Sequence, residues 1–441
     1  MKNLNKKKYL YIVHCIDTEG PLHESLKETF KRLFNTFGIK LSPTKKNLQL
    51  IQNQEINLKG KEVAVQKCFA PNMLSYNNSW NKIEKMLNNI QSKKFRTSLK
   101  DDFNGGWIYS WHCVDHLGFY SNPRRKDKGY GKVFNFYKKT LLKTKINKDD
   151  EINWHFHPLS LKQGALHAAT SYSNNMNYIN YILCRRIIDE KWFPTVNRPG
   201  FHSERSDSNL FLEQWIPFDY ANQKTNEKTD QPDLNSGRFG DWSRAPKSWR
   251  GYRPSIHDYQ RPGECNRYIF RCLNLGTRFR NLKETHINEA FREAKKNGKA
   301  ILAFANHDYR DMSEELTNLK EKIFRIKSKF KDVKIKYLGG HDAAVNLLGY
   351  NNHKKPKLKI SIKKNVLIVT LIQGKLFGSQ PFLAIESKKN RYFHDNFDLI
   401  KIGKQWRYIF DEQTLPLNQI KKIGVGSAGK YGYYDVQVIN L

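Results

Sequence analysis

The sequence predicts an α/β domain followed by a small all-β module. Up to about residue 345, short apolar segments typical of strands alternate with segments in which apolar residues recur at helical spacing. After a polar linker at residues 351–356, apolar and polar residues alternate as they do in strands, and no helical pattern is evident. We therefore expect an α/β domain over residues 1–350 and a β-sandwich over residues 357–441.

The first half of the α/β domain starts with an apolar strand at residues 9–16. Residues 24–65 are polar and rich in lysine, with helical spacing, and predict an insertion over the scaffold. The next expected elements follow in order: a helix at 80–91, a strand at 107–114, a helix at 133–145, a strand at 152–157, a helix at 176–189, and strands at 194–200 and 215–219 with a helix between them.

Residues 221–263 are rich in Gly, Pro, Asn, Asp and Trp and predict a second insertion, a long irregular loop. Loops of that length inside a domain tend to be functional. The sequence then predicts a helix at 285–296, a strand at 300–305, a helix at 313–330 and a strand at 333–338. In the all-β module the expected strands include 358–362, 366–371, 390–393, 398–402 and 405–410.

Composition sets the broad class of the protein. Of the 441 residues, 39% are hydrophobic, which is enough for a packed core, and no segment approaches the ~20 apolar residues that span a bilayer. The basic and apolar N-terminus is interrupted by His14 and runs into Asp17 and Glu19 without a cleavage site, so we interpret it as a strand rather than a signal peptide. The six cysteines show no Cys-x-x-Cys spacing. These features predict a cytoplasmic protein.

The net charge of +35 admits three interpretations. Lysine can be spread over solvated faces, the chain can bind a nucleic acid or an anionic membrane, or the substrate can be anionic, such as a nucleotide- or lipid-phosphate-linked sugar. The basic residues are dispersed and no nucleic-acid motif is present, so we expect no specific nucleic-acid partner. Several arginines fall in loops that we expect on the catalytic face: Arg124, Arg125, Arg205, Arg244, Arg250 and Arg253.

Two motifs at strand ends carry groups that suit a metal site. The sequence Asp17-Thr18-Glu19 follows the first strand, and its two acids can divide labour, one holding a metal while the other accepts a proton from water. His155 and His157 end a later strand. Residues two apart on a strand share a face, so the two imidazoles suit a divalent ion. Each motif alone is also compatible with a turn, a cap or a structural histidine.

Two further motifs complete the set. Arg198-Pro199-Gly200 ends a strand, and its arginine can hold a buried carboxylate in the ionised form. His307 follows the strand at residues 300–305, where it could serve as a general acid. An ordinary turn remains the alternative for each.

The order of the four motifs resembles that of the polysaccharide deacetylases, carbohydrate esterase family four with the NodB-homology fold. The resemblance covers about residues 9–345, and residues 214–220 resemble the late strand of the family that ends in Asp. The Asp-x-Glu and His-x-His-Pro forms are similar to the branch associated with bacterial surface-polysaccharide (O-antigen or capsule) biosynthesis. The resemblance implies a distorted (β/α)7-type barrel and a hydrolase that removes an N-acyl, typically acetyl, group from a sugar.

The resemblance also implies a role for each motif residue. Asp17 would be the catalytic base, oriented by Arg198, and His307 the acid that protonates the leaving amine. One divalent metal would be bound, with zinc favoured and cobalt, nickel or iron as alternatives. Its implied ligands are Glu19, His155 and His157.

The chain departs from the common family pattern at three points. Thr18 separates the two acids, which are adjacent in the common form. The two histidines are two residues apart instead of four, so His167 is an alternative ligand. The hydrophobic Pro-containing segment of the family is not recognisable around Asn274. A deformylase or amidase with the same residues and a non-catalytic glycan-binding protein remain alternative functions.

Aromatic residues of the 221–263 loop offer a place for the substrate. They could form a wall on which a sugar ring stacks, although local packing within the loop is the alternative. The candidates for substrate contact are Phe239, Trp242, Trp249, Tyr252 and Arg253.

Overall fold

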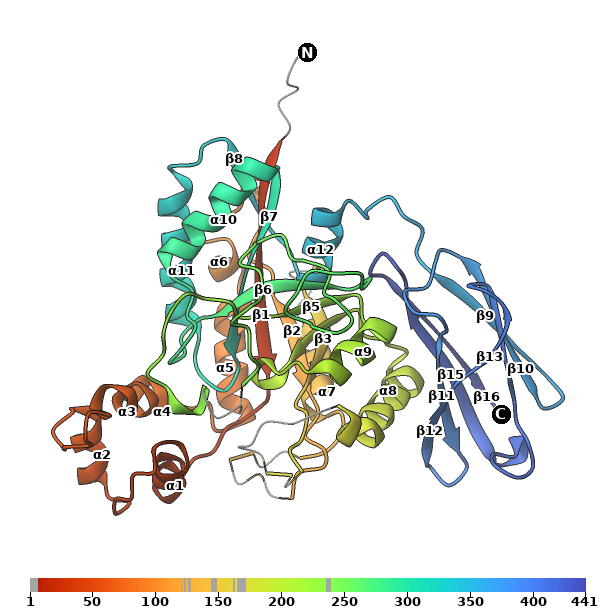
Figure 1. The fold of residues 1–441 in the computed structure, drawn as a ribbon, viewed down its shortest axis with the longest axis horizontal. Helices are drawn as coiled ribbons and strands as arrows, with labels where there is room; N and C mark the ends of the chain where they lie inside the picture. Colours follow the sequence, from red (N-terminus) through yellow and green to blue (C-terminus); the bar gives the residue numbers. More distant parts are fainter. Residues whose placement is uncertain are drawn as a thin grey trace, which may run out of the picture.

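Seven parallel strands close into a barrel in the computed structural model, which describes residues 7–120, 122, 124–125, 128–143, 149–161, 163–164, 172–234 and 239–441. The strands follow one another around the ring, β7 returns to pair with β1, and β8 adds to β1 outside the ring (Figure 1). The predicted α/β barrel is thereby confirmed. The strands are β1 (Lys8–Thr18), β2 (Ser110–Val114), β3 (Glu151–Phe156), β4 (Val196–Pro199), β5 (Phe218–Asn222), β6 (Tyr268–Asn274), β7 (Lys299–His307) and β8 (Val333–Tyr337).

The helices account for the remaining regular structure of the described α/β region. The α-helices are α1 (Leu26–Phe37), α2 (Lys45–Gln52), α3 (Glu62–Phe69), α4 (Pro71–Leu74), α5 (Trp80–Ile90), α6 (Lys93–Arg96), α7 (Lys132–Lys143), α8 (Met176–Glu190), α9 (Ser206–Trp215), α10 (Glu284–Asn297), α11 (Ser313–Lys327) and α12 (Gly340–Leu348). Short 3-10 turns are η1 (Ser173–Asn175), η2 (Gly200–His202) and η3 (Pro232–Leu234).

Alternate residues of β1 serve two different cores. Leu10 and Ile12 point outward into a cluster formed with α5, α10 and α11. Tyr11, Val13 and Cys15 point into the barrel, where they meet the inner residues of the neighbouring strands. Helix α12 packs against the same inner cluster through residues 343–347 and so closes the amino end of the barrel. The carboxyl end remains for the site.

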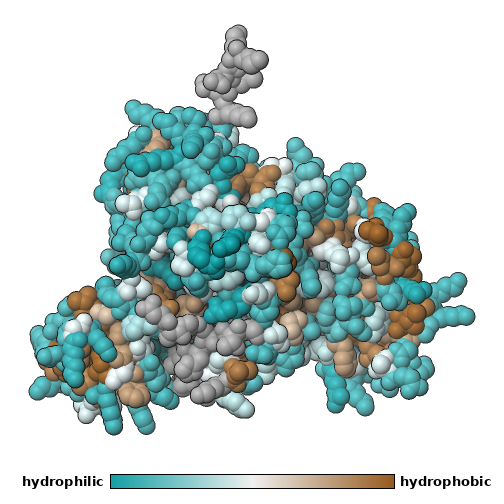
Figure 2. Space-filling model, viewed as in Figure 1, coloured by the Kyte–Doolittle hydropathy of each residue, from teal (hydrophilic) through white to brown (hydrophobic). Residues whose placement is uncertain are grey.

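Residues 24–74 fold as a helical lobe made of α1–α4. Ser25 begins α1 with a capping box to Glu28, which satisfies free N–H groups at the helix start. The lobe has its own apolar cluster, which includes Phe30, Leu33 and Val65. It lies beside the carboxyl ends of the barrel strands (Figure 1). Hydrophobic residues show mainly on this lobe and on the C-terminal sheets in the view of Figure 2, where most of the remaining surface is hydrophilic.

The C-terminal region forms two antiparallel sheets of four strands, in the orders β13–β14–β10–β9 and β12–β11–β15–β16. Side chains from both sheets form a shared core, among them Val369, Ile385 and Trp406. The predicted all-β character is confirmed. The elements are β9 (Lys357–Lys363), β10 (Val366–Gln373), β11 (Phe382–Ser387), β12 (Tyr392–Asp395), β13 (Asp398–Lys401), β14 (Gln405–Ile409), the 3-10 turn η4 (Leu417–Gln419), β15 (Ile420–Ala428) and β16 (Tyr434–Asn440).

The state of the cysteines and the length of the helices apply to the whole described chain. All six cysteines are free and buried. Within the described ranges, every helix falls short of the length and apolarity that crossing a membrane requires.

Candidate metal centre

The side chains that the sequence motifs predict to carry the chemistry lie on the inner face of the barrel, at the carboxyl ends of its strands. Asp17 continues the inward row of β1, two residues after Cys15, and His307 continues the inward row of β7, two residues after Ala305. The two residues are direct partners in the β1–β7 pairing. His155 of β3 is likewise the partner of Arg198 of β4. The sheet therefore brings motifs from distant parts of the sequence together.

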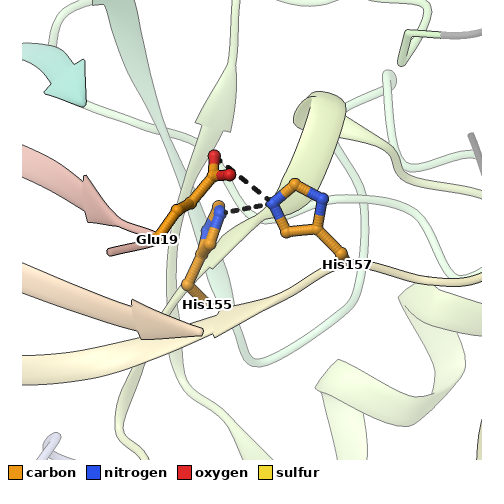
Figure 3. A group of neighbouring side chains, drawn as sticks. All are labelled: Glu19, His155 and His157. Atoms are coloured by element: carbon orange, nitrogen blue, oxygen red, sulfur yellow. Dashed lines mark hydrogen bonds and ion pairs between the residues drawn. The ribbon is translucent and has the colours of Figure 1, made fainter. Parts of the chain in front are cut away.

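Glu19, His155 and His157 point toward one another (Figure 3). The Nε2 atoms of the two histidines are 2.9 Å apart, and Nε2 of His157 is 3.7 Å from Oε1 of Glu19. One donor atom from each of the three residues lies within 4.8 Å of the other two. Ligands at ~2.0–2.2 Å from one ion are separated by about 3–4 Å, so these donors fit a single divalent metal.

Both histidines present a neutral ring nitrogen to the centre. Nδ1 of His155 is 2.5 Å from the carbonyl oxygen of Arg198 and donates its proton there, which leaves the Nε2 lone pair free. Burial lowers the pKa of His155 and of His157 to about 4 and outweighs the opposing attraction of Glu19. Neutral imidazole is the form that binds metals.

Glu19 is ionised and held in place by its neighbours. Burial alone would raise the pKa of Glu19, but Arg125 and then His157 and His307 lower it, so that the net value falls well below the ordinary range. Arg125 pairs with the Glu19 carboxylate and also donates to the carbonyl of Gly20, at 2.7 Å.

Asp308 fixes the backbone of this acidic turn. Its carboxylate accepts the N–H groups of Glu19 at 2.9 Å and of Gly20 at 3.0 Å, and the hydroxyl of Tyr137 donates to it at 2.9 Å. This role was not predicted from the sequence. The adjacency of Asp308 to His307 at a strand end was the only indication in the sequence.

Asp17 is oriented by a buried arginine. Nε of Arg198 donates to Oδ1 of Asp17 at 2.8 Å, and its Nη1 donates to the carbonyl of Tyr220 at 2.8 Å. Burial opposes the charge of Arg198, but Asp17 more than compensates, and the pKa of Arg198 is raised. The guanidinium therefore stays charged and keeps the carboxylate in one position.

His307 completes the group. Its Nε2 is 3.7 Å from Oδ2 of Asp17 and 3.9 Å from Oε1 of Glu19. Nδ1 of His307 has no hydrogen-bond partner among the described residues. Burial lowers the pKa of His307 to about 4 despite the attraction of both acids. The ring is therefore neutral at pH 7 and can act as an acid only after it receives a proton.

Gly200 makes room for the ring of His157. A Cβ atom at this position would lie 2.5 Å from Cγ of His157, closer than any real contact. The following turn is unusual, because Phe201 and His202 both have positive φ angles, of 53° and 51°. Nε1 of Trp242 donates to the carbonyl of His202 at 3.0 Å and supports this turn.

The predicted sugar-stacking wall is therefore wrong for three of its aromatic members. Trp242 and Trp249 are 1% exposed and Tyr252 is 8% exposed. Trp242 and Tyr252 pack in one apolar cluster and Trp249 packs in the cluster between the barrel and its helices, so none of the three rings offers an open face to a ligand. Arg253 donates to the carbonyls of Glu264 and Cys265. It lies near the amino end of β6, away from the cavity, because Tyr252 pairs with Ile269. Phe239 does line the cavity in front of the centre.

That cavity has a volume of about 210 Å³ and opens between the barrel, the helical lobe and the loop after β6. Asp17, Glu19, His155, His157 and His307 all line it. Aromatic side chains from several loops contribute the rest of its apolar wall: Tyr76, Phe119, Phe201, Phe239, Phe279 and Tyr309.

Two remaining candidates do not add to the site. His167, the alternative ligand, lies outside the described residues. Glu151, His341 and Asp342 also gather their donor atoms. The carboxylate oxygens of Glu151, however, accept the backbone N–H groups of His341 at 3.0 Å and of Asp342 at 3.1 Å. This second cluster therefore holds the start of α12.

The arrangement can bind one metal ion beside a carboxylate that can take a proton and an imidazole that can pass it on. Comparisons with family models, curated proteins and solved structures find no match. These capabilities are therefore inferred from the geometry of this chain alone.

Proposed function

We propose that the protein is a metal-dependent hydrolase that removes an N-acyl group from a sugar or sugar conjugate. The observation that carries the proposal is the convergence of Glu19, His155 and His157 beside Asp17 and His307 in one cavity. Three protein ligands leave open positions on an ion, as in catalytic centres. Two imidazoles favour zinc, with cobalt, nickel or iron as alternatives.

The ion in this position would polarise the acyl carbonyl and make a water molecule more acidic. Asp17 is the group that accepts the proton of the attacking water, because Arg198 holds its carboxylate toward the centre. As the water oxygen bonds to the acyl carbon, the carbon–nitrogen bond breaks and the nitrogen needs a proton. His307 lies 3.7 Å from Asp17 and delivers that proton to the leaving amine.

A carbohydrate substrate is supported by the order of the motifs, which resembles the polysaccharide deacetylases of surface-polysaccharide biosynthesis. The acyl group we expect is acetyl. A formyl group, or an amide on another molecule, would require the same residues. A non-catalytic glycan-binding protein has less support, because binding alone gives no reason to place a base and a proton carrier beside the three ligands.

Metal analysis of the purified protein tests the proposal directly. We expect one divalent ion per wild-type chain and none in a His155→Ala/His157→Ala variant. His341→Gln is the matched control, because it removes a histidine from the second donor cluster and should leave the metal content unchanged. One retained equivalent of metal in the double variant would show that the ion is bound elsewhere.

Substrate trials should follow with the same proteins. Acetate and formate release from N-acetyl and N-formyl amino sugars identifies the acyl group, and either product should depend on both histidines. A metal-replete wild-type protein that releases neither would leave the glycan-binding alternative.

A further inference from the structure

The cavity in front of the metal centre is strongly basic. Five arginines from four separate segments line it: Arg32, Arg124, Arg125, Arg278 and Arg310. Two of them are neutralised individually, because Arg125 pairs with Glu19 and Arg278 makes a two-pronged contact with Asp233 at 2.8 and 2.5 Å. The other three are not balanced in this way.

Arg32 and Arg124 share a single carboxylate. Nε and Nη2 of Arg32 donate to the two oxygens of Glu24, both at 2.9 Å. Nε of Arg124 lies 3.0 Å from Oε1 of the same residue. The Glu24 side chain is 1% exposed, so it is fully committed to these contacts. Two positive charges therefore face the cavity against one negative charge.

Arg310 has no carboxylate within 4.0 Å among the described residues. Its Nη2 donates to the carbonyl of Gly276 at 2.9 Å, and its Nη1 contacts the sulfur of Met73 at 3.6 Å. A guanidinium has five N–H donors, so several remain for a ligand. The carboxyl of Glu315 interacts with Arg310 at longer range, since burial raises the pKa of Glu315 and Arg310 opposes this rise. Arg310 thus lacks a direct ion pair, and an anion in the cavity could supply one.

Two tyrosines join the three arginines into one wall. The guanidinium of Arg124 lies 5.7 Å from the ring centre of Tyr76, whose hydroxyl donates to Glu24. The rings of Tyr76 and Tyr309 are 6.2 Å apart, and Arg310 lies 5.4 Å from the ring of Tyr309. A continuous set of contacts thus links Arg32, Arg124 and Arg310 through Glu24, Tyr76 and Tyr309.

We propose that Arg32, Arg124 and Arg310 form a subsite for a phosphate group of the substrate. This inference rests on the proposed function and names its substrate class: an N-acyl sugar that carries a phosphate ester. Phosphate offers several oxygens to more than one guanidinium, and arginine binds it through paired hydrogen bonds. A neutral glycan would leave the surplus charge without a partner.

The cavity also continues away from the metal centre. A second cavity of about 980 Å³ shares Phe239, Arg278 and Phe279 with the first. It is lined mainly by polar and charged side chains, including Lys224 and Arg280. The remainder of a larger substrate could therefore extend past Phe239 and Phe279 onto a hydrophilic surface.

Phosphate binding can be measured without knowing the substrate. Inorganic phosphate should bind wild-type protein, and Arg310→Gln should weaken this binding by about tenfold, the loss expected for a charged hydrogen-bonding partner. Arg310→Lys should restore part of it. Arg250→Gln is the matched control, because Arg250 is exposed and does not line the cavity. Equal weakening in Arg310→Gln and Arg250→Gln would overturn the subsite.

The His155→Ala/His157→Ala variant separates this inference from the proposed function. It should still bind phosphate, with the same dependence on Arg310, even though it has lost the metal. Loss of phosphate binding in this variant would show that phosphate binds to the ion and not to the arginines. Metal binding and amide hydrolysis without any Arg310-dependent phosphate binding would overturn the subsite and leave the hydrolase standing.

Competing ligands then identify the source of the phosphate. Tighter binding of uridine diphosphate than of phosphate would support a nucleotide-linked sugar, and tighter binding of farnesyl phosphate would support a lipid-linked one. Glucuronate that binds as tightly as phosphate, with the same loss in Arg310→Gln, would replace phosphate by a carboxylate and overturn the substrate class.

Discussion

The spacing of single residues decides which side chains meet at the proposed metal centre. Asp17 and His307 each stand two positions after a residue that faces the barrel interior, so the alternation of a strand places them on the inner face as well. A shift of one residue in either strand would turn the group toward the outer helices. The pairing of His155 with Arg198 on β4 likewise fixes where His155 lies in the sheet.

Asp17→Asn should abolish turnover and keep the metal. The amide has nearly the same size as the carboxylate but cannot accept the proton, and Asp17 is not among the three ligands. We expect kcat to fall by about 10²–10⁴-fold, the usual contribution of a general base. Amide hydrolysis and metal content should be measured on the same preparation. Wild-type turnover in metal-replete Asp17→Asn would exclude this carboxylate as the base.

His307→Ala should affect substrates according to their leaving group. An amine must be protonated as it departs, whereas an activated phenolate ester needs little help. We therefore expect a large loss of kcat for the amide and a small one for a p-nitrophenyl ester. An equal loss for both substrates would indicate that His307 acts before the carbon–nitrogen bond breaks.

Gly200→Ala should weaken metal binding without unfolding the barrel. The added Cβ would lie 2.5 Å from the His157 ring, so the ring must shift from its present position beside Glu19 and His155. Disturbing the support of a ligand typically costs about 10–100-fold in metal affinity. Metal titration with circular dichroism of both proteins would check this, and an unchanged Kd would show that His157 is not a ligand.

Lys320 should make the stability of the fold depend on pH. Burial, and then Arg96, lower the pKa of Lys320 to about 7 from the ordinary 10.5. Between these values the unfolded chain binds more protons, so the free energy of unfolding rises with pH, by at most ~1.4 kcal/mol per unit. Below pH 7 both states are protonated and the contribution no longer changes.

Lys320→Met should flatten this rise, as measured by urea unfolding at pH 7 and pH 9. Lys322→Met, on the exposed side of the same helix, should keep the wild-type slope. The same slope in Lys320→Met and wild type would mean that Lys320 does not titrate in this range.

At the scale of elements, the sequence predicted the helices and strands whose apolar residues recur at the regular spacing of a helix or a strand. Helix α8 and strands β1 and β7 are of this kind. Strand β6 was missed, because Arg271 interrupts its apolar run. The guanidinium of that residue lies 4.4 Å from the ring of Trp249 in the preceding loop. Helix α12 was missed because its start is held by Glu151, which is remote in the sequence.

The residues of the site likewise fall into those that the sequence predicted and those that it did not. The residues proposed as ligands and base stand at the ends of recognisable strands, so their positions followed from the sequence. The direction of Trp242 did not, because its partner is the carbonyl of His202 in a turn with positive φ angles. The composition of a loop does not tell which of its aromatic rings face the ligand.

The helical lobe can be removed to test its role as an element. Leu22 donates to the carbonyl of Asn77 at 3.1 Å, so the two ends of the insertion already lie together. Replacing residues 24–75 with a short Gly-Ser link should leave the barrel folded and the metal bound, because all three ligands lie outside the lobe. Phosphate binding should be weakened, because Arg32 is removed with the lobe. Loss of the metal as well would show that the lobe supports the centre.

At the scale of the whole molecule, the barrel and the C-terminal sheets share an apolar cluster. Ile187 and Ile188 of α8, together with Phe193, pack against Phe382 and Ala384 of the second sheet. Helix α8 therefore buries one side on the barrel and the other on the C-terminal sheets. This packing explains why α8 carries buried residues around most of its circumference.

A chain that ends after residue 352 should consequently be less stable than the full protein. Removal of the sheets exposes the apolar side of α8, and each large apolar side chain that returns to water loses ~1.5–3 kcal/mol of stabilisation. We expect a lower Tm and aggregation, as measured by calorimetry and light scattering. Unchanged melting of the shortened chain would mean that the two parts pack without stabilising each other.

Gly424→Val tests the same packing without removing any residues. A Cβ atom at Gly424 would lie 2.6 Å from a methyl carbon of Ile187, so a larger side chain must push β15 away from α8. We expect a loss of ~1–3 kcal/mol, typical of overpacking, in urea unfolding. Lys422→Val lies two residues earlier in the same strand, is partly exposed, and should change stability little. Unchanged stability in Gly424→Val would mean that the sheet can move from α8 at no cost, and that shortening the chain should then be tolerated as well.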